Sequence, residues 1–155
     1  MIYCGVAVIR KLSFVLGILI LLMMGGLGCI RASIMIKNER KLQQLGENAP
    51  TFRYFFWELE WRTGCWVYIT SGYRSTAKQK ILYEKDSRNA RPGTSRHEHK
   101  KAVDINLLCW DGRLRKSSKK KRWKAKGVHI AAKKHSLIWG GNFSGYYDPV
   151  HFAIR

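Results

Sequence analysis

Hydrophobic residues form one long run near the amino terminus of this chain and shorter periodic groups after it. Residues 12–30, LSFVLGILILLMMGGLGCI, contain no charged residue. A helix of this length would extend roughly 28 Å, close to the hydrocarbon thickness of a bilayer. A buried helix of a globular protein rarely lacks a polar face over such a distance. We therefore predict a transmembrane or signal-anchor segment at residues 1–31.

The fate of this segment stays open among three readings. A retained anchor is the reading that we favour. Gly26-Leu27-Gly28 is a small-x-small site of the kind that signal peptidases cut, so a cleaved signal is the second. Cys29 suggests a lipoprotein, although the usual branched aliphatic residue is missing three positions before it.

The pattern changes to a helical period after the hydrophobic run. Residues 32–50 are mostly polar and predict a helical stalk that ends before Pro50. Thr51 can cap a further helix that ends at Gly64. One apolar stripe at the spacing i, i+3, i+4, i+7 marks the buried face of that helix, made of Phe52, Phe55, Phe56 and Leu59.

Residues 51–155 predict one α+β domain, a small antiparallel sheet with flanking helices. Strands and helices alternate without a regular βαβ repeat, which favours this class over a parallel sheet. The segments predicted as strands are 65–71, 101–108 and 149–155. Those predicted as helices are 76–87, with Ala77, Ile81 and Leu82 turned inward, and 128–139. Residues 111–127 predict a basic loop.

The chain is strongly basic, with a formal net charge of +19. Arg10 and Lys11 are the only charged residues before position 31, so the remainder carries a net charge of +17. Such a surface attracts polyanions, which include nucleic acid, anionic lipids and acidic cell-wall polymers. Charge runs are usually solvated surface, so we expect wall polymers or lipids as partners rather than nucleic acid.

The four cysteines form no CxxC pair, which argues against a thiolate zinc site. Cys65 and Cys109 both fall in the predicted domain. They can form a disulfide outside the cytoplasm, or they can be two unrelated buried thiols.

The stretch SRHEHKKAVD, residues 95–104, places two histidines and two acidic residues close together. His97 falls in the predicted loop, Asp104 on the strand after it, and His151 on the last strand. Two imidazoles and one carboxylate form a three-ligand tetrahedral zinc site whose fourth position stays open to water, as in hydrolytic zinc enzymes. His99 is a competing ligand, because it lies on the same face as His97 if the loop is extended.

A second acidic residue precedes the last candidate ligand. Asp148 stands three residues before His151, and Pro149 between them bends the entry to the strand. Asp148 is therefore predicted on the preceding turn, where its carboxylate can act as a general base beside the metal.

Three separate blocks of the sequence share their order and spacing with the motifs of a known family. SRHEHKKAVD resembles the signature S-x-H-x-x-G-x-A-x-D, and WGGNFSGYYDPVHF resembles a block W-G-G…D-x-x-H-F. TSGYRS, followed by Gln79 and by LY at 82–83, is similar to the first block. The family is that of the zinc D-alanyl-D-alanine carboxypeptidases and L-alanyl-D-glutamate endopeptidases of cell walls, and the resemblance covers about residues 51–155.

The resemblance implies a role for each residue of the site. His97, Asp104 and His151 would hold Zn²⁺, and Asp148 would be the catalytic base. Arg74 would steady the substrate carbonyl or the oxyanion, since a guanidinium supplies donors where negative charge develops.

Three further residues of the matching blocks would support the site or the substrate. They are Ser95, Gln79 and Trp139. Ser95 would cap the loop or orient a ligand rather than attack the substrate.

The W-G-G block and the aspartate base look most like the phage endolysin branch, which cuts the L-alanyl-D-glutamate bond of peptidoglycan stem peptides. A D-alanyl-D-alanine carboxypeptidase or dipeptidase of the same family is the alternative. Lys100 replaces the signature's glycine, and Ala153 stands where the family often has an acidic residue. A degenerate binding protein, with Trp123 and the lysines of 116–126 gripping a polyanion, is therefore a third reading.

The expected location is the cytoplasmic membrane, with a single span and the catalytic domain on the periplasmic or extracellular side. The domain would be secreted if the amino-terminal segment is cleaved. The basic residues after the span, among them Arg31 and Lys37, favour the opposite orientation by the positive-inside rule. We nevertheless expect the catalytic domain outside the cytoplasm, because peptidoglycan, its expected substrate, lies there.

Overall fold

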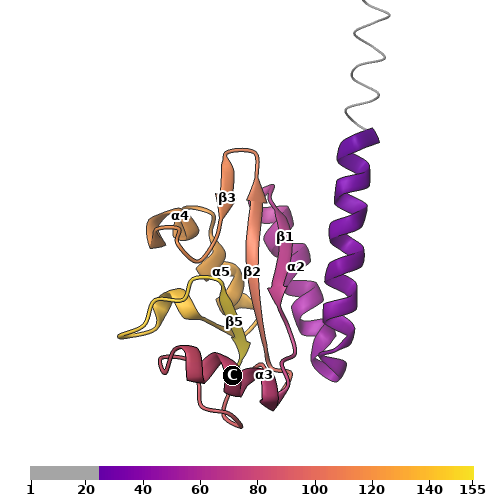
Figure 1. Cartoon of the computed structure of the whole chain (residues 1–155). Coiled ribbons are helices and arrows are strands. Elements are labelled where there is room, and N and C mark those ends of the chain that lie inside the picture. Colours follow the sequence, from indigo (N-terminus) through magenta and orange to yellow (C-terminus); the bar gives the residue numbers. More distant parts are fainter. Residues whose placement is uncertain (1–24) are drawn as a thin grey trace, which may run out of the picture. The chain divides into compact units, whose positions relative to one another are not determined.

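The computed structural model describes residues 25–155 (Figure 1). Residues 37–155 form one compact unit, and residues 25–36 lie outside it. Residues 25–43 are helical. Most of the predicted membrane segment lies outside the described residues. From residue 25 onward the structure contains no helix with the length and apolar character needed to cross a membrane.

Residues 37–155 form an α+β unit with a small antiparallel sheet and flanking helices, which confirms the predicted class. The helices are α2 (Ala49–Thr63), α3 (Thr76–Lys85), α4 (Lys120–Ala125) and α5 (Val128–Lys134), with 3₁₀ turns η1 (Gly46–Asn48) and η2 (Gly140–Asn142). The strands are β1 (Trp66–Ser71), β2 (Ala102–Cys109), β3 (Gly112–Leu114), β4 (Leu137–Trp139) and β5 (His151–Ile154).

The strands follow the order β1-β2-β5-β4, and β3 pairs with β2 as a hairpin. Every pairing is antiparallel. Asp104 on β2 is the register partner of His151 on β5. On its other side it is the partner of Ser71 on β1, next to an irregularity of the ladder between Ile69 and Ser71. The sheet thus brings together segments almost 50 residues apart in sequence.

The core lies between the sheet and the helices α2 and α5, which cover one face of it (Figure 1). The predicted stripe of α2 is confirmed: all four of its apolar residues are buried. Gly64 ends this helix in a left-handed conformation, with φ of 63°. The other face of the sheet is left for the site described below.

The start of this unit differs from the prediction. α2 begins at Ala49 rather than after Thr51, and Pro50 occupies its first turn, where a missing N–H costs nothing. Leu42 and Leu45 come from the segment predicted as a polar stalk, yet both lie in the core. The side chain of Asn38 bonds to β1 as an added strand would, through Val67 O and Ile69 N.

The prediction of a basic loop at 111–127 is wrong. This segment contains β3 and α4, and Trp123 is completely buried in the core. The helix predicted over 128–139 ends at Lys134, and its last residues form β4. A tryptophan inside the core cannot grip a polyanion, so that part of the third reading is also wrong.

Helix α3 also faces differently from the prediction. Ala77 and Ile81 are exposed, and Leu82 is partly buried. The one buried residue of the helix is Gln79. Ser75 caps its amino terminus by accepting a hydrogen bond from Lys78 N.

Cys65 and Cys109 form a disulfide. It joins the residue just before β1 to the last residue of β2, across a sequence separation of 44. Of the two alternatives for these cysteines, the structure supports the disulfide.

Candidate metal centre

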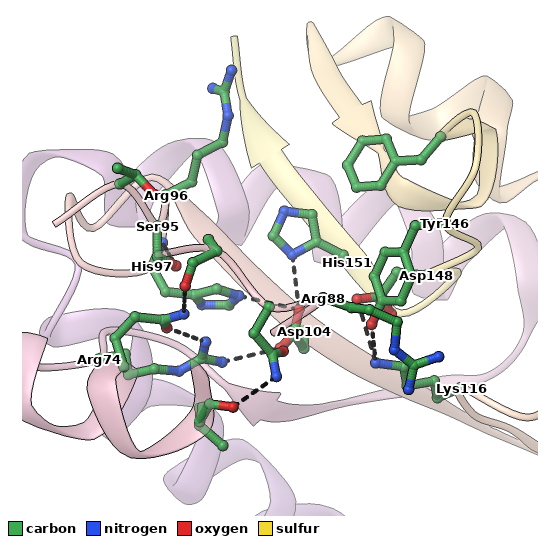
Figure 2. Close-up of a pocket in the computed structure, with 16 residues that line it drawn as sticks. Arg74, Arg88, Ser95, Arg96, His97, Asp104, Lys116, Tyr146, Asp148 and His151 are labelled. Atoms are coloured by element: carbon green, nitrogen blue, oxygen red, sulfur yellow. Dashed lines mark hydrogen bonds and ion pairs between the residues drawn. The ribbon is translucent and has the colours of Figure 1, made fainter. Parts of the chain in front are cut away.

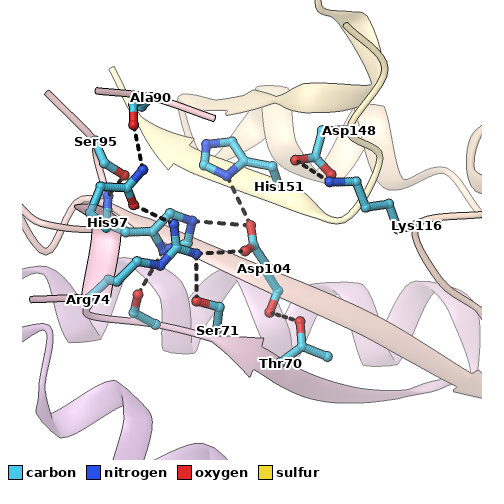
Figure 3. Close-up of polar contacts among 12 residues, drawn as sticks. Thr70, Ser71, Arg74, Ala90, Ser95, His97, Asp104, Lys116, Asp148 and His151 are labelled. Carbon is cyan, nitrogen blue, oxygen red and sulfur yellow. Dashed lines mark hydrogen bonds and ion pairs between the residues drawn. The ribbon is translucent and has the colours of Figure 1, made fainter. Parts of the chain in front are cut away.

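Three predicted ligand residues meet on the face of the sheet opposite α2 (Figure 3). Nε2 of His97 lies 3.2 Å from Oδ1 of Asp104, and Nδ1 of His151 lies 3.0 Å from the same oxygen. One ligand atom from each residue can be chosen so that all three lie within 4.8 Å of one another. The two imidazole rings meet edge to face, with centroids 5.2 Å apart.

The sheet and one turn explain how these residues meet. Asp104 and His151 are register partners on neighbouring strands, so their side chains leave the same face. His97 comes from a turn before β2 that is fastened to the segment after β1, since Arg74 N donates to His97 O at 3.3 Å. His97 is 4% exposed, which makes it the most buried of the three.

The tautomer of His97 follows from its second hydrogen bond. Its Nδ1 lies 2.7 Å from the carbonyl oxygen of Gly72. A carbonyl only accepts, so Nδ1 carries the hydrogen and, in the neutral ring, Nε2 presents a lone pair toward Asp104. This is the arrangement by which proteins orient a histidine that binds a metal.

The donor set fits a zinc ion. Ligand atoms about 2.0–2.2 Å from a tetrahedral zinc stand roughly 3.4 Å apart, and the two separations from Asp104 Oδ1 are close to that value. Burial opposes ionisation of this carboxyl, but hydrogen bonds and positive charge from the two imidazoles, when these are protonated, outweigh it and lower the pKa of Asp104. When a metal ion replaces those protons, the ring nitrogens present lone pairs instead. A carboxylate and a lone pair directed at the same point attract a cation.

The loop that carries His97 is ordered by Glu98, which is not among the predicted site residues. Its carboxylate accepts hydrogen bonds from Gly93 N and Ser95 N. Burial opposes its ionisation, but these bonds prevail and lower the pKa of Glu98. The signal was present as the spacing Ser95-x-x-Glu98, which is that of a capping box.

Ser95 supports the ligand and His99 does not join the site. Ser95 is buried, and its Oγ accepts a hydrogen bond from His97 N at 3.3 Å. The ring of His99 is exposed and lies 3.0 Å from Gly93 O. His99 therefore does not compete for the ligand position.

Arg74 lies beside the three residues and is held by its neighbours (Figure 2). Its guanidinium donates to Gln79 Oε1 at 2.7 Å and to Ser71 Oγ at 3.1 Å. It also lies 3.6 Å from Asp104 Oδ2. Gln79 is itself fixed, because its amide donates to Ala90 O at 2.6 Å. The buried glutamine thus sets the position of the arginine.

Asp148 faces the same cleft from the turn before β5, as the sequence predicts. Its Oδ1 is buried and has no hydrogen-bond partner within residues 25–155, while Oδ2 lies 3.7 Å from Lys116 Nζ. Burial and the charge of Asp104 raise the pKa of Asp148. Lys116 in turn donates to the hydroxyl of Tyr146 at 2.7 Å.

Lys116 and Tyr146 were not predicted as site residues. Lys116 sits within a run of lysines that reads as solvated surface, and the ring of Tyr146 meets it only through the fold. Nζ of Lys116 lies 5.2 Å from the centroid of the Tyr146 ring. No local pattern distinguishes this lysine from its neighbours, so only the structure could identify it.

The W-G-G block shapes the turn beneath Asp148. Trp139 is buried, and its Nε1 donates to Pro149 O at 2.8 Å. A Cβ on Gly140 would stand 2.4 Å from Asp148 O, and one on Gly141 would stand 2.2 Å from the Trp139 ring. Both glycines are therefore required for close packing, and Trp139 supports the turn rather than lining the cleft.

Lys100 adopts a left-handed conformation with φ of 59°. This is the position where the family signature has glycine, and glycine reaches that conformation without steric cost. The turn around Lys100 still keeps its backbone hydrogen bond, since Lys100 N donates to His97 O at 3.2 Å. The lysine therefore carries local strain without disturbing the ligand turn.

The cleft around these groups has a volume of about 460 Å³. The two aspartates line this cleft together with four cationic side chains. The cationic residues are Arg74, Arg88, Arg96 and Lys116. The arrangement combines a cation-binding set, a buried carboxylate and a fixed guanidinium, which together can activate water and stabilise an oxyanion.

Comparison with known proteins agrees with this geometry. Residues 88–154 match the family model described as D-alanyl-D-alanine carboxypeptidase. This match spans less than half of the chain, and over residues 88–154 the chain is similar to that peptidase family. The matched region contains all three candidate ligands and Asp148.

Solved structures resemble the chain as well. The L-Ala D-Glu endopeptidase ChiX of Serratia marcescens superimposes with a TM-score of 0.58 at 22% identity, over 77% of this chain and 86% of that one. At this identity the likeness shows a shared fold. VanYB in complex with D-alanine-D-alanine has a TM-score of 0.49 at 20% identity, over 68% of each chain.

Proposed function

We propose that this protein is a zinc peptidase that cuts the L-alanyl-D-glutamate bond in the stem peptides of peptidoglycan. The observation that carries the proposal is the meeting of His97, Asp104 and His151 at the wall of a cleft that also holds Asp148 and Arg74. The similarity of residues 88–154 to a peptidase family model supports hydrolysis as the reaction.

In this proposal the two histidines and Asp104 hold a zinc ion. When bound, such an ion polarises a carbonyl and makes water a stronger acid near neutral pH. The sheet and the bond from His97 to Gly72 keep the three ligand side chains in place. Little ordering is then needed when the metal enters.

Asp148 is the general base. Its raised pKa makes the carboxylate a stronger base. It would take a proton from the attacking water and return it to the leaving amine. Lys116 keeps the carboxylate ionised and turned toward the cleft.

Arg74 would stabilise the negative charge that develops on the carbonyl oxygen. Its guanidinium is already held by Gln79 and Ser71, so no ordering is required during the reaction. The guanidinium of Arg74 also lies next to a proposed metal ligand, Asp104, and so close to the expected position of the metal.

The choice of bond rests on the likeness to ChiX, whose name states the L-Ala D-Glu endopeptidase activity, and on the aspartate base before His151. A D-alanyl-D-alanine carboxypeptidase is the second candidate, because the matching family model carries that description. The two differ in where the substrate chain ends relative to the metal.

We further propose that the domain works outside the cytoplasm, tethered by the amino-terminal segment or released after its cleavage, in the manner of a lysin. The disulfide between Cys65 and Cys109 supports an oxidising location. The basic surface would favour adsorption to anionic wall polymers and lipid headgroups.

A pair of histidine variants tests the proposal. His151→Ala should abolish release of peptides from purified peptidoglycan while leaving binding to an anionic polymer unchanged. His99→Ala, on the same basic domain but outside the site, should retain both properties. Equal hydrolysis by His151→Ala and the parent protein would overturn the proposal.

A further inference from the structure

A second groove adjoins the cleft and shares three residues with it. Its volume is about 570 Å³. Asp104, Lys116 and Asp148 line both cavities. The residues that line only the second groove are Thr70, Asn106, Arg115, Ser117 and Val150. His97 and His151 line only the first cleft, so the proposed reaction centre lies in that cleft, at the edge that it shares with the second groove.

The floor of the second groove continues the surface that carries the proposed metal ligands. Asp104 and Asn106 leave the same face of β2, while Ile105 between them is buried. Two residues along a strand span about 7 Å, close to the length of two residues of a bound peptide. Thr70, at the irregularity of β1, donates to Asp104 O at 3.0 Å and lines the same floor.

The side wall is the turn after β3. Arg115 N donates to Ser118 Oγ at 3.0 Å, and Tyr147 Oη donates to Ser118 O at 2.9 Å. These bonds fix the backbone from which the two basic side chains project. Lys116 turns toward Tyr146 and Asp148, on the side of the first cleft.

Arg115 is the cationic residue that lines the second groove and not the first cleft. Its guanidinium is exposed and, across residues 25–155, forms neither an ion pair nor a side-chain hydrogen bond. A guanidinium without a partner is suited to bind a carboxylate through two parallel hydrogen bonds.

We infer that the second groove is a substrate subsite in which Arg115 binds a carboxylate on the peptide segment beyond the scissile bond. The substrate then runs through both cavities, so the enzyme cuts an internal bond rather than removing a terminal residue. This inference rests on the proposed function and defines its substrate as an acidic peptide extended on both sides of the bond.

The test uses the zinc-loaded full chain and synthetic stem peptides. The peptides are lengthened by one residue at the amino or the carboxyl end, with either glutamate or the uncharged glutamine added. At one of the two ends, kcat/KM should be higher for glutamate by roughly fivefold. Arg115→Gln should remove this preference. Arg113→Gln, an exposed arginine on β3 that lines neither cavity, should retain it.

Two results would overturn the inference while leaving the proposed function intact. One is cleavage without a preference for glutamate at either end. The other is a preference that persists in Arg115→Gln. If the zinc-loaded protein cuts none of the peptides and no peptidoglycan, the proposed function fails and the inference fails with it. A thermal unfolding curve checks that both arginine variants are folded.

Discussion

Nε2 of His97 lies 3.2 Å from Oδ1 of Asp104, while the opposite nitrogen of the same ring donates its hydrogen to Gly72 O. In the neutral ring, a lone pair and a carboxylate oxygen thus face each other. Such a pair is repulsive unless a proton or a metal ion lies between them. With His151 on the same oxygen, the arrangement favours a divalent metal.

Removal of one ligand should weaken metal binding strongly. We predict that His97→Ala weakens the affinity for Zn²⁺ by more than about a hundredfold, since loss of mere supporting groups already costs 10–100-fold. The reason is that two donors cannot close a tetrahedral site. Isothermal titration of the metal-stripped protein measures the affinity. His99→Ala is the control, and an unchanged affinity in His97→Ala would exclude His97 as a ligand.

Gln79 should control the arginine without touching the metal. We predict that Gln79→Ala lowers kcat about tenfold, because Arg74 loses its 2.7 Å partner and its fixed orientation. Zinc affinity should stay unchanged. Lys80→Ala, at the next and exposed position of α3, is the matched control. A fall in zinc affinity without loss of kcat would contradict the role given to Gln79.

Lys100 should be a position of stored strain. At φ of 59°, glycine is more favourable than any residue with a Cβ. We predict that Lys100→Gly raises the free energy of unfolding by roughly 0.5–1 kcal/mol over Lys100→Ala, after allowing for the greater freedom of glycine in the unfolded chain. Urea unfolding of both variants measures the difference. A less stable glycine variant would show that the turn carries no strain.

Acid should weaken the fold through Glu58. Hydrogen bonds from Lys134 and Arg62 lower its pKa to about 2, against burial that raises it, with a further contribution from His135. The folded pKa is below the unfolded value of 4.5, so the stabilisation is complete above about pH 4.5 and is lost as the pH falls toward 2.

The variant Glu58→Gln should therefore unfold with a weaker pH dependence between pH 5 and 2. At pH 7 it should be less stable than the parent by about 2 kcal/mol, since hydrogen bonds to a charged group are lost. Denaturant unfolding at several pH values measures both effects. Glu84→Gln, on the exposed face of α3, should follow the parent curve. Parallel curves for Glu58→Gln and the parent would refute the assignment.

The disulfide should contribute strongly to stability. Its sequence separation of 44 closes a loop whose entropy corresponds to about 4 kcal/mol in the chain-entropy estimate. We predict a loss of that order in the double variant Cys65→Ala and Cys109→Ala, measured by urea unfolding. Cys29→Ser should change nothing, because Cys29 is a free and exposed thiol. Equal stability of the double variant would contradict the estimate.

Local periodicity predicted the elements whose buried face is apolar. The stripe of α2 and the alternation of β2 depend on residues that must leave water, and both faces were correct. Helix α3 failed this reasoning because its buried residue is a glutamine, held by Arg74 and Ala90. A buried amide is stable only with partners that the tertiary structure supplies.

The candidate ligands could be predicted from residue type and motif spacing, but their meeting depends on sheet register. The pairing of Asp104 with His151 is a long-range property, and no local pattern determines it. Lys116 was missed for the same reason. Trp123 was misread because lysines surround it in sequence, whereas its helix turns the ring into the core.

A comparison of zinc-loaded and chelator-stripped protein on purified peptidoglycan, with mass spectrometry of the released termini, tests whether hydrolysis depends on zinc and which bond is cut. We predict that only the zinc-loaded form acts and that new amino termini begin with D-glutamate. Zinc-dependent loss of terminal D-alanine would transfer the activity to the carboxypeptidase branch. Protein that is folded yet binds no zinc and releases no peptide would exclude a zinc peptidase.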